Sequence, residues 1–578
     1  MTLDPLGALP PDLQARLLQA AATPAAPVAP IGPVTPKRIL RDARDTDPLA
    51  VQLVNEPFPL NEEQQAITQA VVADRLDTVV RAKAGTGKTS TLEALARRID
   101  IRTPGTRILY VAFNKAVSVE AEMRMPPNVE SRTGHSLAWG HLPVTITGKI
   151  ARDRLAEVHP EISASDELRF LRSRPKAIGN ALRISPQDGE TVRLLVDVFA
   201  NSADDELSMD HLDALASTRE IPDGPGPRRK LLAAAQRFWD DVSRPLGKGR
   251  CQFMPSQDQL RKMWALSRPD FRLHGSGVRV PAQVVFLDEA QDTPPVLARV
   301  IREQAPEVQR VVVGDESQAI YGFSGATDYL SEAATSMGAD LPLTTSYRFG
   351  PKISQIANRF LEELGVEELV RGAAGPDQVG WMQDAYAVLT RTNAGMIEEI
   401  GRETERGRRV GLLPETRADL MALIDTTYHL RDGGPRPPQK HKALGRFDSW
   451  EAALEELEQV KGGSDFTVAM NIVKRWTLPQ LRRFASESVQ VHDVKRSGCD
   501  VVVVTAHKAK GLEWDAVRIG GDFYGPDRKP PKHSGTQFDD PEHLRLNYVA
   551  VTRAKKRLDL GSLGWIREYD RGAVVRAA

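Results

Sequence analysis

Seven short apolar runs, rich in β-branched residues and bounded by polar turns, constrain the fold of this 578-residue chain more than any other feature. They cover residues 76–82, 107–113, 283–288, 308–315, 386–391, 501–507 and 516–523. Continuous runs of this kind suit strands that are buried on both faces, as in parallel sheets covered by helices. The runs form two groups, and a long stretch of helical pattern interrupts each group. The sequence therefore predicts an α/β fold with two parallel-sheet domains, each carrying a mainly helical insertion.

The predicted domain boundaries follow changes in this pattern. Residues 1–56 are rich in proline and alanine, and we expect a disordered tail there because such a segment has little capacity to pack. The other predicted boundaries are 57–139 with 283–339 for the first core domain, 140–282 for its helical insertion, 340–395 with 496–578 for the second core domain, and 396–495 for the second insertion.

Composition excludes several classes of protein. The chain has only two cysteines, Cys251 and Cys499, which rules out a disulfide framework, a four-cysteine iron–sulfur site and a zinc ribbon. No window approaches the roughly 18 apolar residues that span a membrane, and the N-terminus lacks the pattern of a secretory signal. We therefore expect a cytoplasmic protein without membrane contact. The 77 basic and 77 acidic residues balance, so the overall charge gives no sign of a nucleic-acid partner.

The strongest local signal is the segment Arg81-Ala-Lys-Ala-Gly-Thr-Gly-Lys-Thr89, which follows a predicted strand and precedes a helical pattern. Glycines let backbone N–H groups surround phosphate oxygens, and the helix N-terminus adds its positive dipole end. Ala82 stands where the P-loop pattern G-x-x-x-x-G-K-[ST] has its first glycine, and alanine is small enough for that position. The alternative is an incidental glycine-rich turn. The predicted nucleotide contacts here are Ala84, Gly85, Thr86, Gly87, Lys88, Thr89 and Ser90.

A second segment, VVFLDEAQD, places two adjacent carboxylates at the carboxyl end of an apolar strand. Such groups are costly to bury unless they hold a metal or act on water. Asp288, together with the Thr89 hydroxyl, is predicted to bind Mg²⁺, and Glu289 is the candidate general base. The alternative is a strand end followed by an acidic helix cap, a role that suits Asp292.

Nine segments in a fixed order carry a family resemblance. They are FPLNEEQQAI, the P-loop, AFNKA, RTGHSLAW, DEAQD, GDESQAIYGFSGA, SYRF, TAHKAKGLEWD and NYVAVTRAKK. Together they resemble the motif set of superfamily-one DNA helicases of the UvrD/Rep type. The sequences of the motifs are most similar to those of the F-box DNA helicase branch and its bacterial and phage relatives. The resemblance implies two RecA-like P-loop core domains with parallel sheets, ATP and Mg²⁺ as cofactors, and DNA as the partner.

The resemblance also implies roles for residues outside the glycine-rich segment and the acidic segment. Gln64 matches the glutamine that reads adenine, Tyr347 the aromatic that stacks on the base, and Glu513 the carboxylate that contacts the ribose. Three further matches act at the γ-phosphate: the sensor Gln318 and the arginine fingers Arg348 and Arg553. The alternative for each arginine is a surface ion pair.

For the DNA track, stacking of bases on aromatic faces is tolerant of sequence. The residues that the resemblance places there are Phe113, Asn114, His135, Tyr321, Phe323 and His507. Phe323-Ser324 stands where many UvrD/Rep members have Trp-Arg, so the ring at this position is smaller. Trp139 and Trp514 suit either the track or the core. A DNA-binding protein with zero net charge needs a basic groove balanced by acidic outer faces. We therefore expect lysine and arginine to concentrate along one groove.

The resulting hypothesis is an ATP-dependent helicase that translocates on single-stranded DNA, 3′→5′ by resemblance, and unwinds duplex DNA as two core domains close and reopen. Two alternatives remain: a translocase that mainly displaces proteins from DNA, and a non-enzymatic DNA-binding scaffold. Expected partners are single-stranded and duplex DNA, with protein partners at the N-terminal tail or the helical insertions. The pathway, RNA preference and oligomeric state stay open.

Overall fold

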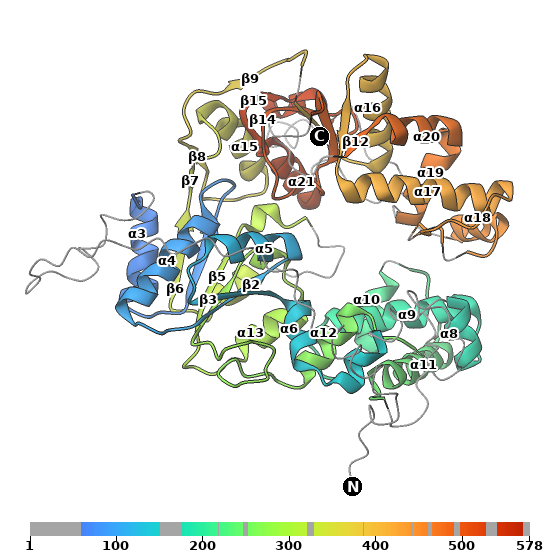
Figure 1. The fold of residues 1–578 in the computed structure, drawn as a ribbon, viewed down its shortest axis with the longest axis horizontal. Helices are drawn as coiled ribbons and strands as arrows, with labels where there is room; N and C mark the ends of the chain where they lie inside the picture. Colours follow the sequence, from blue (N-terminus) through green and yellow to red (C-terminus); the bar gives the residue numbers. More distant parts are fainter. Residues whose placement is uncertain are drawn as a thin grey trace, which may run out of the picture. The chain divides into compact units, whose positions relative to one another are not determined.

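The strands of the computed structural model form a six-stranded, a seven-stranded and a two-stranded sheet within the residues that the structure describes (Figure 1). Those residues are 59–150, 175–217, 219–246, 253–320, 329–384, 386–441, 443–445, 447–459, 465–490, 498–526 and 540–569. The predicted tail, residues 1–56, lies outside them.

The six-stranded sheet has the order β3-β2-β4-β5-β1-β6. Its strands are β1 (Thr78–Ala82), β2 (Ile108–Ala112), β3 (Val129–Thr133), β4 (Val284–Leu287), β5 (Gln309–Gly314) and β6 (Ala339–Leu343). The pairs β1–β6, β2–β3 and β2–β4 are parallel. The glycine-rich loop follows β1, and the acidic segment follows β4.

The seven-stranded sheet has the order β12-β11-β13-β10-β14-β15-β9, and all its neighbouring strands are parallel. Its strands are β9 (Gln378–Val379), β10 (Ala387–Thr390), β11 (Val410–Leu412), β12 (Val489–Gln490), β13 (Val501–Thr505), β14 (Trp514–Ile519) and β15 (Ala554–Asp559). A short pair, β7 (Thr345–Ser346) with β8 (Arg371–Gly372), forms the third sheet.

The run VVVV in β13 shows why the apolar strands are continuous. Val502 and Val504 belong to the core cluster formed with α15 (Pro351–Glu363) and α21 (Pro541–Val551). Val501 and Val503 belong to a different cluster, formed with the helices of the second insertion. Successive side chains of a strand point to opposite faces, so both faces of this sheet are covered. The predicted α/β class with parallel sheets is confirmed.

By its internal contacts the chain divides into two compact units. The first comprises the described parts of Met1–Asp77, Leu92–Leu287 and Pro294–Val311, and the second those of Thr78–Thr91, Asp288–Thr293 and Val312–Ala578. The dividing line passes through β5 and through α4 (Lys88–Arg102). The second unit therefore contains the glycine-rich loop after β1, the acidic segment after β4 and the whole seven-stranded sheet.

Helices of the first unit build a separate core in the predicted insertion 140–282. Buried Phe199, Phe238 and Trp239 are among the residues that pack in it, and Figure 1 shows its helices gathered together. The helices of this unit, apart from α4, are α3 (Glu62–Thr68), η2 (Gln69–Ala73), α5 (Lys115–Arg124), α6 (Gly134–His141), α8 (Pro175–Leu182), α9 (Pro186–Asn201), α10 (Met209–Ala216), α11 (Pro225–Ser243), α12 (Gln257–Leu266) and α13 (Pro295–Arg302).

The described part of the predicted insertion 396–495 contains helices joined by turns, together with β11 and β12, which extend the seven-stranded sheet. Its helices are α16 (Asn393–Glu405), α17 (Pro414–Asp432), α18 (Trp450–Gln459), α19 (Asp465–Arg475) and α20 (Leu478–Glu487). The second unit also holds η5 (Ala290–Asp292), η6 (Glu316–Gln318), α14 (Tyr329–Ala334) and η9 (Gly561–Arg567).

All seven apolar runs form strands, with small changes at their ends. The largest is in the run 516–523, because β14 begins at Trp514 and ends at Ile519. The six-stranded sheet also reaches Leu343, four residues beyond the predicted boundary at residue 339.

Candidate nucleotide site

The glycine-rich loop lies between β1 and α4, as the sequence predicts. Gly85 and Gly87 have φ values of +75° and +85°, a left-handed conformation that glycine adopts without strain. Thr86 is buried, and its hydroxyl donates to the Lys83 carbonyl at 2.8 Å, which fixes the turn. Lys88 and Thr89 then open α4, at the helix end where backbone N–H groups face outward.

The segment after β7 packs directly against this loop within the second unit. The Tyr347 N–H donates to the Gly85 carbonyl at 2.9 Å. A Cβ at Gly85 would lie 2.5 Å from the Arg348 Cβ and 2.6 Å from the Ser346 hydroxyl oxygen. Gly85 is therefore required for close approach as well as for its backbone conformation.

The acidic segment lies beside the P-loop lysine. Lys88 Nζ is 3.0 Å from the Glu289 carboxylate, and Asp288, which is buried, accepts the Glu289 N–H at 2.9 Å. Glu289 has a φ of 53°, a left-handed conformation that costs a non-glycine residue free energy. Strain of this kind concentrates at functional sites, where the surrounding structure holds it in place.

Charges in this segment are strongly perturbed. Burial opposes ionisation of Glu289, but Lys88, Lys510 and a hydrogen bond from Gln291 outweigh it and hold the pKa of Glu289 at about 2. Burial likewise opposes the charge on Lys88, but Glu289, Asp288 and Asp315 outweigh it and raise the lysine pKa. Both groups are therefore ionised at neutral pH.

Gln318 and Arg553 also meet in the second unit. Arg553 Nη2 donates to Gln318 Oε1 at 3.0 Å, and Gln318 Nε2 donates to the Asp315 carboxylate at 2.7 Å. All three side chains are buried. Burial, and then the neighbouring Arg348, lower the pKa of Arg553 to about 9, which leaves the guanidinium charged at neutral pH.

Arg348 pairs with Glu513 at 2.8 Å and donates to the Thr552 carbonyl at 3.2 Å. Lys555 is a second partner of Glu513, at 3.1 Å. Burial opposes the charge of Glu513, but these cations lower its pKa. Glu513, the predicted ribose contact, is thus held between two cations. The ring of Tyr347, the predicted stacking partner of the base, is 52% exposed.

Gln64 belongs to the first unit, at the start of α3. Its buried side chain accepts the Asn61 N–H at 3.1 Å, while Asn61 accepts the Gln64 N–H at 2.8 Å, which is a capping box. The amide oxygen of Gln64 thus has a structural role, and its amide NH₂ is the group that suits an adenine nitrogen acceptor.

The predicted DNA contacts divide into exposed and paired residues. Phe113 is 40% exposed, whereas the Asn114 side chain caps α5 by accepting the Val117 N–H at 2.9 Å. His135 Nε2 lies 3.0 Å from Asp258 and 3.1 Å from Arg261. Burial, and then nearby Arg391 and Lys510, lower the pKa of His507 to about 4, so it is neutral. Tyr321 and Phe323 lie outside the described residues.

Two tryptophans that suited either the track or the core differ in burial. Trp514 is buried in the core of the second unit, while Trp139 is 37% exposed.

An ion pair that sequence reasoning missed joins the DEAQD and HKAKG segments. Lys510 Nζ pairs with the buried Asp292 carboxylate and donates to the Gln318 carbonyl at 2.7 Å. A helix cap was the alternative interpretation of Asp292, but its carboxylate pairs with a lysine more than 200 positions away. Both residues lie in quoted motifs, yet nothing in the sequence pairs them.

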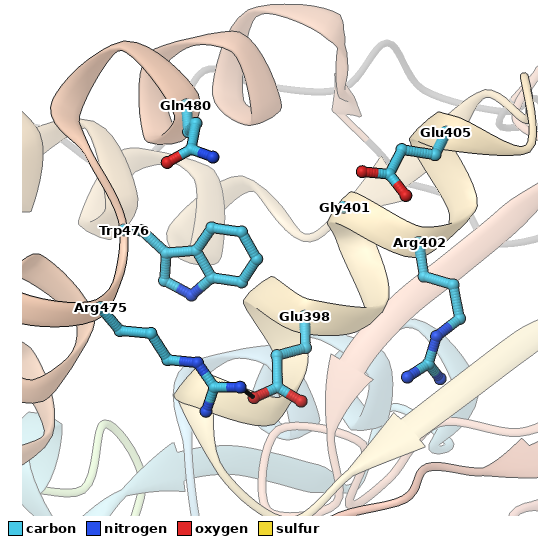
Figure 2. Close-up of a pocket in the computed structure, with 7 residues that line it drawn as sticks. All are labelled: Glu398, Gly401, Arg402, Glu405, Arg475, Trp476 and Gln480. Atoms are coloured by element: carbon cyan, nitrogen blue, oxygen red, sulfur yellow. Dashed lines mark ion pairs between the residues drawn. The ribbon is translucent and has the colours of Figure 1, made fainter.

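A surface depression of about 360 Å³ lies between α16, α19 and α20 (Figure 2). The residues that line it are Glu398, Gly401, Arg402, Glu405, Arg475, Trp476 and Gln480. Arg475 pairs with Glu398 at 2.6 Å, and the two arginines balance the two glutamates. The depression contains no residue predicted from sequence and has no net charge that would select a ligand.

The donors near Lys88 fit magnesium. Mg²⁺ takes oxygen ligands, keeps several waters, and binds through one or two carboxylates plus phosphate oxygens. The Thr89 hydroxyl and the Asp288 carboxylate supply such donors. Among the described residues no group of three or more histidines, cysteines or acidic residues forms a separate metal site, and no helix there has the length and apolar character to cross a membrane.

Comparison with known proteins agrees with this geometry. Residues 63–324 match the family described as an AAA domain, and residues 378–562 match the UvrD-like helicase C-terminal domain. F-box DNA helicase 1 of Gallus gallus is 29% identical over 86% of the chain and 48% of its own length. F-box DNA helicase protein 1 of Schizosaccharomyces pombe is 27% identical over 87% of the chain and 57% of its own length. DNA helicase IV of Escherichia coli is 25% identical over 87% of the chain and 68% of its own length. The chain thus spans about half the length of the first two relatives.

Proposed function

Because the chain belongs to the UvrD-like helicases of superfamily one, we propose that it is an ATP-dependent DNA helicase that moves along single-stranded DNA and separates duplex strands. One observation carries the proposal: Lys88 pairs with Glu289, and Arg553 bonds to Gln318, four residues that were predicted from four separate motifs. Gln291 connects the two pairs in the second unit, because it donates to Glu289 and accepts the N–H of Asp315, which in turn accepts from Gln318. Translocation in the 3′→5′ direction is part of the proposal and rests on the resemblance.

Lys88 and Glu289 begin the proposed reaction as an ion pair. When ATP binds, Lys88 turns to the β- and γ-phosphate oxygens and leaves Glu289. The lysine is a main cause of the low pKa of Glu289, so its departure makes the carboxylate a better acceptor for a proton of the attacking water. In this scheme nucleotide binding itself activates the general base.

Arg348 and Arg553 stabilise the negative charge that develops on the γ-phosphoryl group, and Gln318 detects that group through its contact with Arg553. Mg²⁺ held by Thr89 and Asp288 would neutralise charge on the phosphate oxygens. Exposed Tyr347 stacks on adenine, Gln64 reads its edge, and Glu513 takes the ribose hydroxyls.

On the DNA side, the exposed ring of Phe113 stacks on a base, at roughly 1–3 kcal/mol per base. Asn114, His135, Tyr321, Phe323 and His507 are the other proposed contacts. The two proposed core domains, 57–139 with 283–339 and 340–395 with 496–578, close on ATP and reopen after hydrolysis, which advances the strand.

A strand-displacement assay tests the proposal, with 3′-tailed, 5′-tailed, forked and RNA substrates in the presence of ATP and Mg²⁺. We expect 3′-tailed DNA to be unwound and Lys88→Ala to abolish both unwinding and DNA-stimulated ATP hydrolysis. Lys556→Ala is the matched control, because that lysine is exposed and pairs only at the surface with Asp515. Retained DNA-stimulated hydrolysis in Lys88→Ala would contradict the assignment. Displacement of a bound protein without strand separation would instead identify a translocase.

A further inference from the structure

Tyr548 is a buried tyrosine of α21 whose hydroxyl connects two segments of the nucleotide site. The Ala84 N–H, in the glycine-rich loop, donates to the Tyr548 hydroxyl oxygen at 3.1 Å. The hydroxyl in turn donates to Asp315 Oδ2 at 3.4 Å. The second distance is long for an O–H···O hydrogen bond, so it is the weaker link.

Asp315 is itself the anchor of the γ-phosphate sensor. The same oxygen, Oδ2, accepts from Gln318 Nε2 at 2.7 Å, and Oδ1 accepts the Ser317 N–H at 3.0 Å. Gln318 then accepts from Arg553 at 3.0 Å. A continuous series of hydrogen bonds therefore runs from the Ala84 N–H, through Tyr548 and Asp315, to the sensor glutamine and an arginine finger.

The hydroxyl matters here more than the ring. The Tyr548 ring packs in the core cluster of the second unit, a position that phenylalanine would fill equally well. Ala84, Asp315 and Tyr548 are all buried, and a buried polar group without a partner is costly. Burial, and then the charge of Asp315, raise the pKa of Tyr548 well above its ordinary value, so the phenol keeps its proton and remains a donor.

We propose that Tyr548 is a positioning residue that couples the phosphate-binding loop to the γ-phosphate sensor, by holding the Ala84 amide and the Asp315 carboxylate through one hydroxyl. The coupling role rests on the proposed function, because it presupposes ATP hydrolysis at this site. Among the predicted nucleotide contacts the hydroxyl bonds to the Ala84 N–H, and its hydrogen bonds reach neither Lys88 nor Thr89, so we expect it to affect turnover more than nucleotide affinity. Coupling of this kind requires a physical connection, which the hydrogen bonds supply.

Amide hydrogen exchange of the full chain tests the connection without any assay of activity. In Tyr548→Phe, peptides containing residues 82–86 and 314–318 should exchange several-fold faster than in the unmodified chain, because Ala84 loses its acceptor and Asp315 loses a donor. Tyr569→Phe, a second buried tyrosine of the same cluster, is the control and should leave both peptides unchanged. Unchanged exchange in Tyr548→Phe would overturn the connection, as would equal acceleration by the control.

Steady-state kinetics tests the coupling role. For Tyr548→Phe we expect kcat of DNA-stimulated ATP hydrolysis to fall about 10-fold with KM for ATP within about 2-fold, the size expected for one hydrogen bond to a charged group. Asp315→Asn should also lower kcat, and the double variant should be no worse than the poorer single variant. A raised KM with unchanged kcat, or losses that multiply in the double variant, would refute the role. If the unmodified chain hydrolyses no ATP, the proposed function fails while the exchange experiment still decides the connection.

Discussion

Replacing Lys510 by methionine tests how strongly burial perturbs the acidic segment after β4. The lysine pairs with the buried carboxylate of Asp292, whose other oxygen, Oδ1, has no hydrogen-bond partner in the described part of the chain. Burial raises the pKa of Asp292 from 3.8 to about 6, with Lys510 opposing the rise and Glu289 adding to it. Without Lys510, the carboxylate is left unpaired, or it takes up a proton.

The sign of the pH dependence follows from this pKa. The folded-state value lies above the unfolded value, so the contribution of Asp292 to stability falls as pH rises from about 4 to about 6 and is constant above that. In Lys510→Met the pKa rises further, and the fall continues above pH 6 at about 1.4 kcal/mol per pH unit. The variant is therefore destabilised by at most about 3 kcal/mol at pH 8, and by less than about 1 kcal/mol at pH 6.

Scanning calorimetry at pH 6 and pH 8 measures the difference. A domain of this kind loses about 2–4 °C of Tm per kcal/mol, so we expect a decrease of at most about 6–12 °C at pH 8 and at most about 2–4 °C at pH 6. Lys556→Met is the control, since its pair with Asp515 is 66% and 58% exposed and should contribute little at either pH. Equal decreases at both pH values would refute the reasoning, because they would show that Lys510 does not act through the titration of Asp292.

Three further variants address the chemistry. Glu289→Gln should lower kcat for ATP hydrolysis by about 10²–10⁴ while a fluorescent ATP analogue still binds, and lost binding would contradict a role as general base. Arg553→Lys keeps a cation but loses the contact with Gln318, so kcat should fall by about 10³ or more in stopped-flow phosphate release; near-normal turnover would exclude an arginine finger. Phe113→Ala should weaken single-stranded DNA binding by about 1–3 kcal/mol in fluorescence anisotropy with unchanged Tm, because the ring is 40% exposed. An unchanged affinity would remove Phe113 from the track.

Strands with continuous apolar sequences were predictable, and several strands that contain charged residues or proline were not. The run 501–505 has no polar residue before Thr505 and reads as a buried strand. By contrast, β15 contains Lys555, Lys556 and Arg557, and β6 contains Pro342. Proline is tolerated at an edge, where β6 lies, because its missing N–H breaks no ladder there. Tertiary context, and not local pattern, makes these segments strands.

The candidate site shows the same limit at the level of single residues. Motif order predicted that Lys88, Glu289, Gln318 and Arg553 act together, and the structure places them in one group. The order of the motifs gave no indication that Tyr548 faces Ala84, 464 positions away. The direction of a side chain on a buried helix depends on the packing of the whole unit. Partners that lie far apart in sequence are determined by the fold.

The left-handed backbone of Glu289 has a consequence for how this chain responds to selection. Glycine or asparagine adopts that conformation more readily than glutamate does, so either replacement should relieve strain of about 1 kcal/mol or more. Each would also delete the carboxylate proposed to act on water. The same carboxylate pairs with Lys88, and the loss of that pair opposes the relief of strain. Selection for heat resistance therefore depends on which of the two effects is larger, whereas selection for turnover keeps the strained residue.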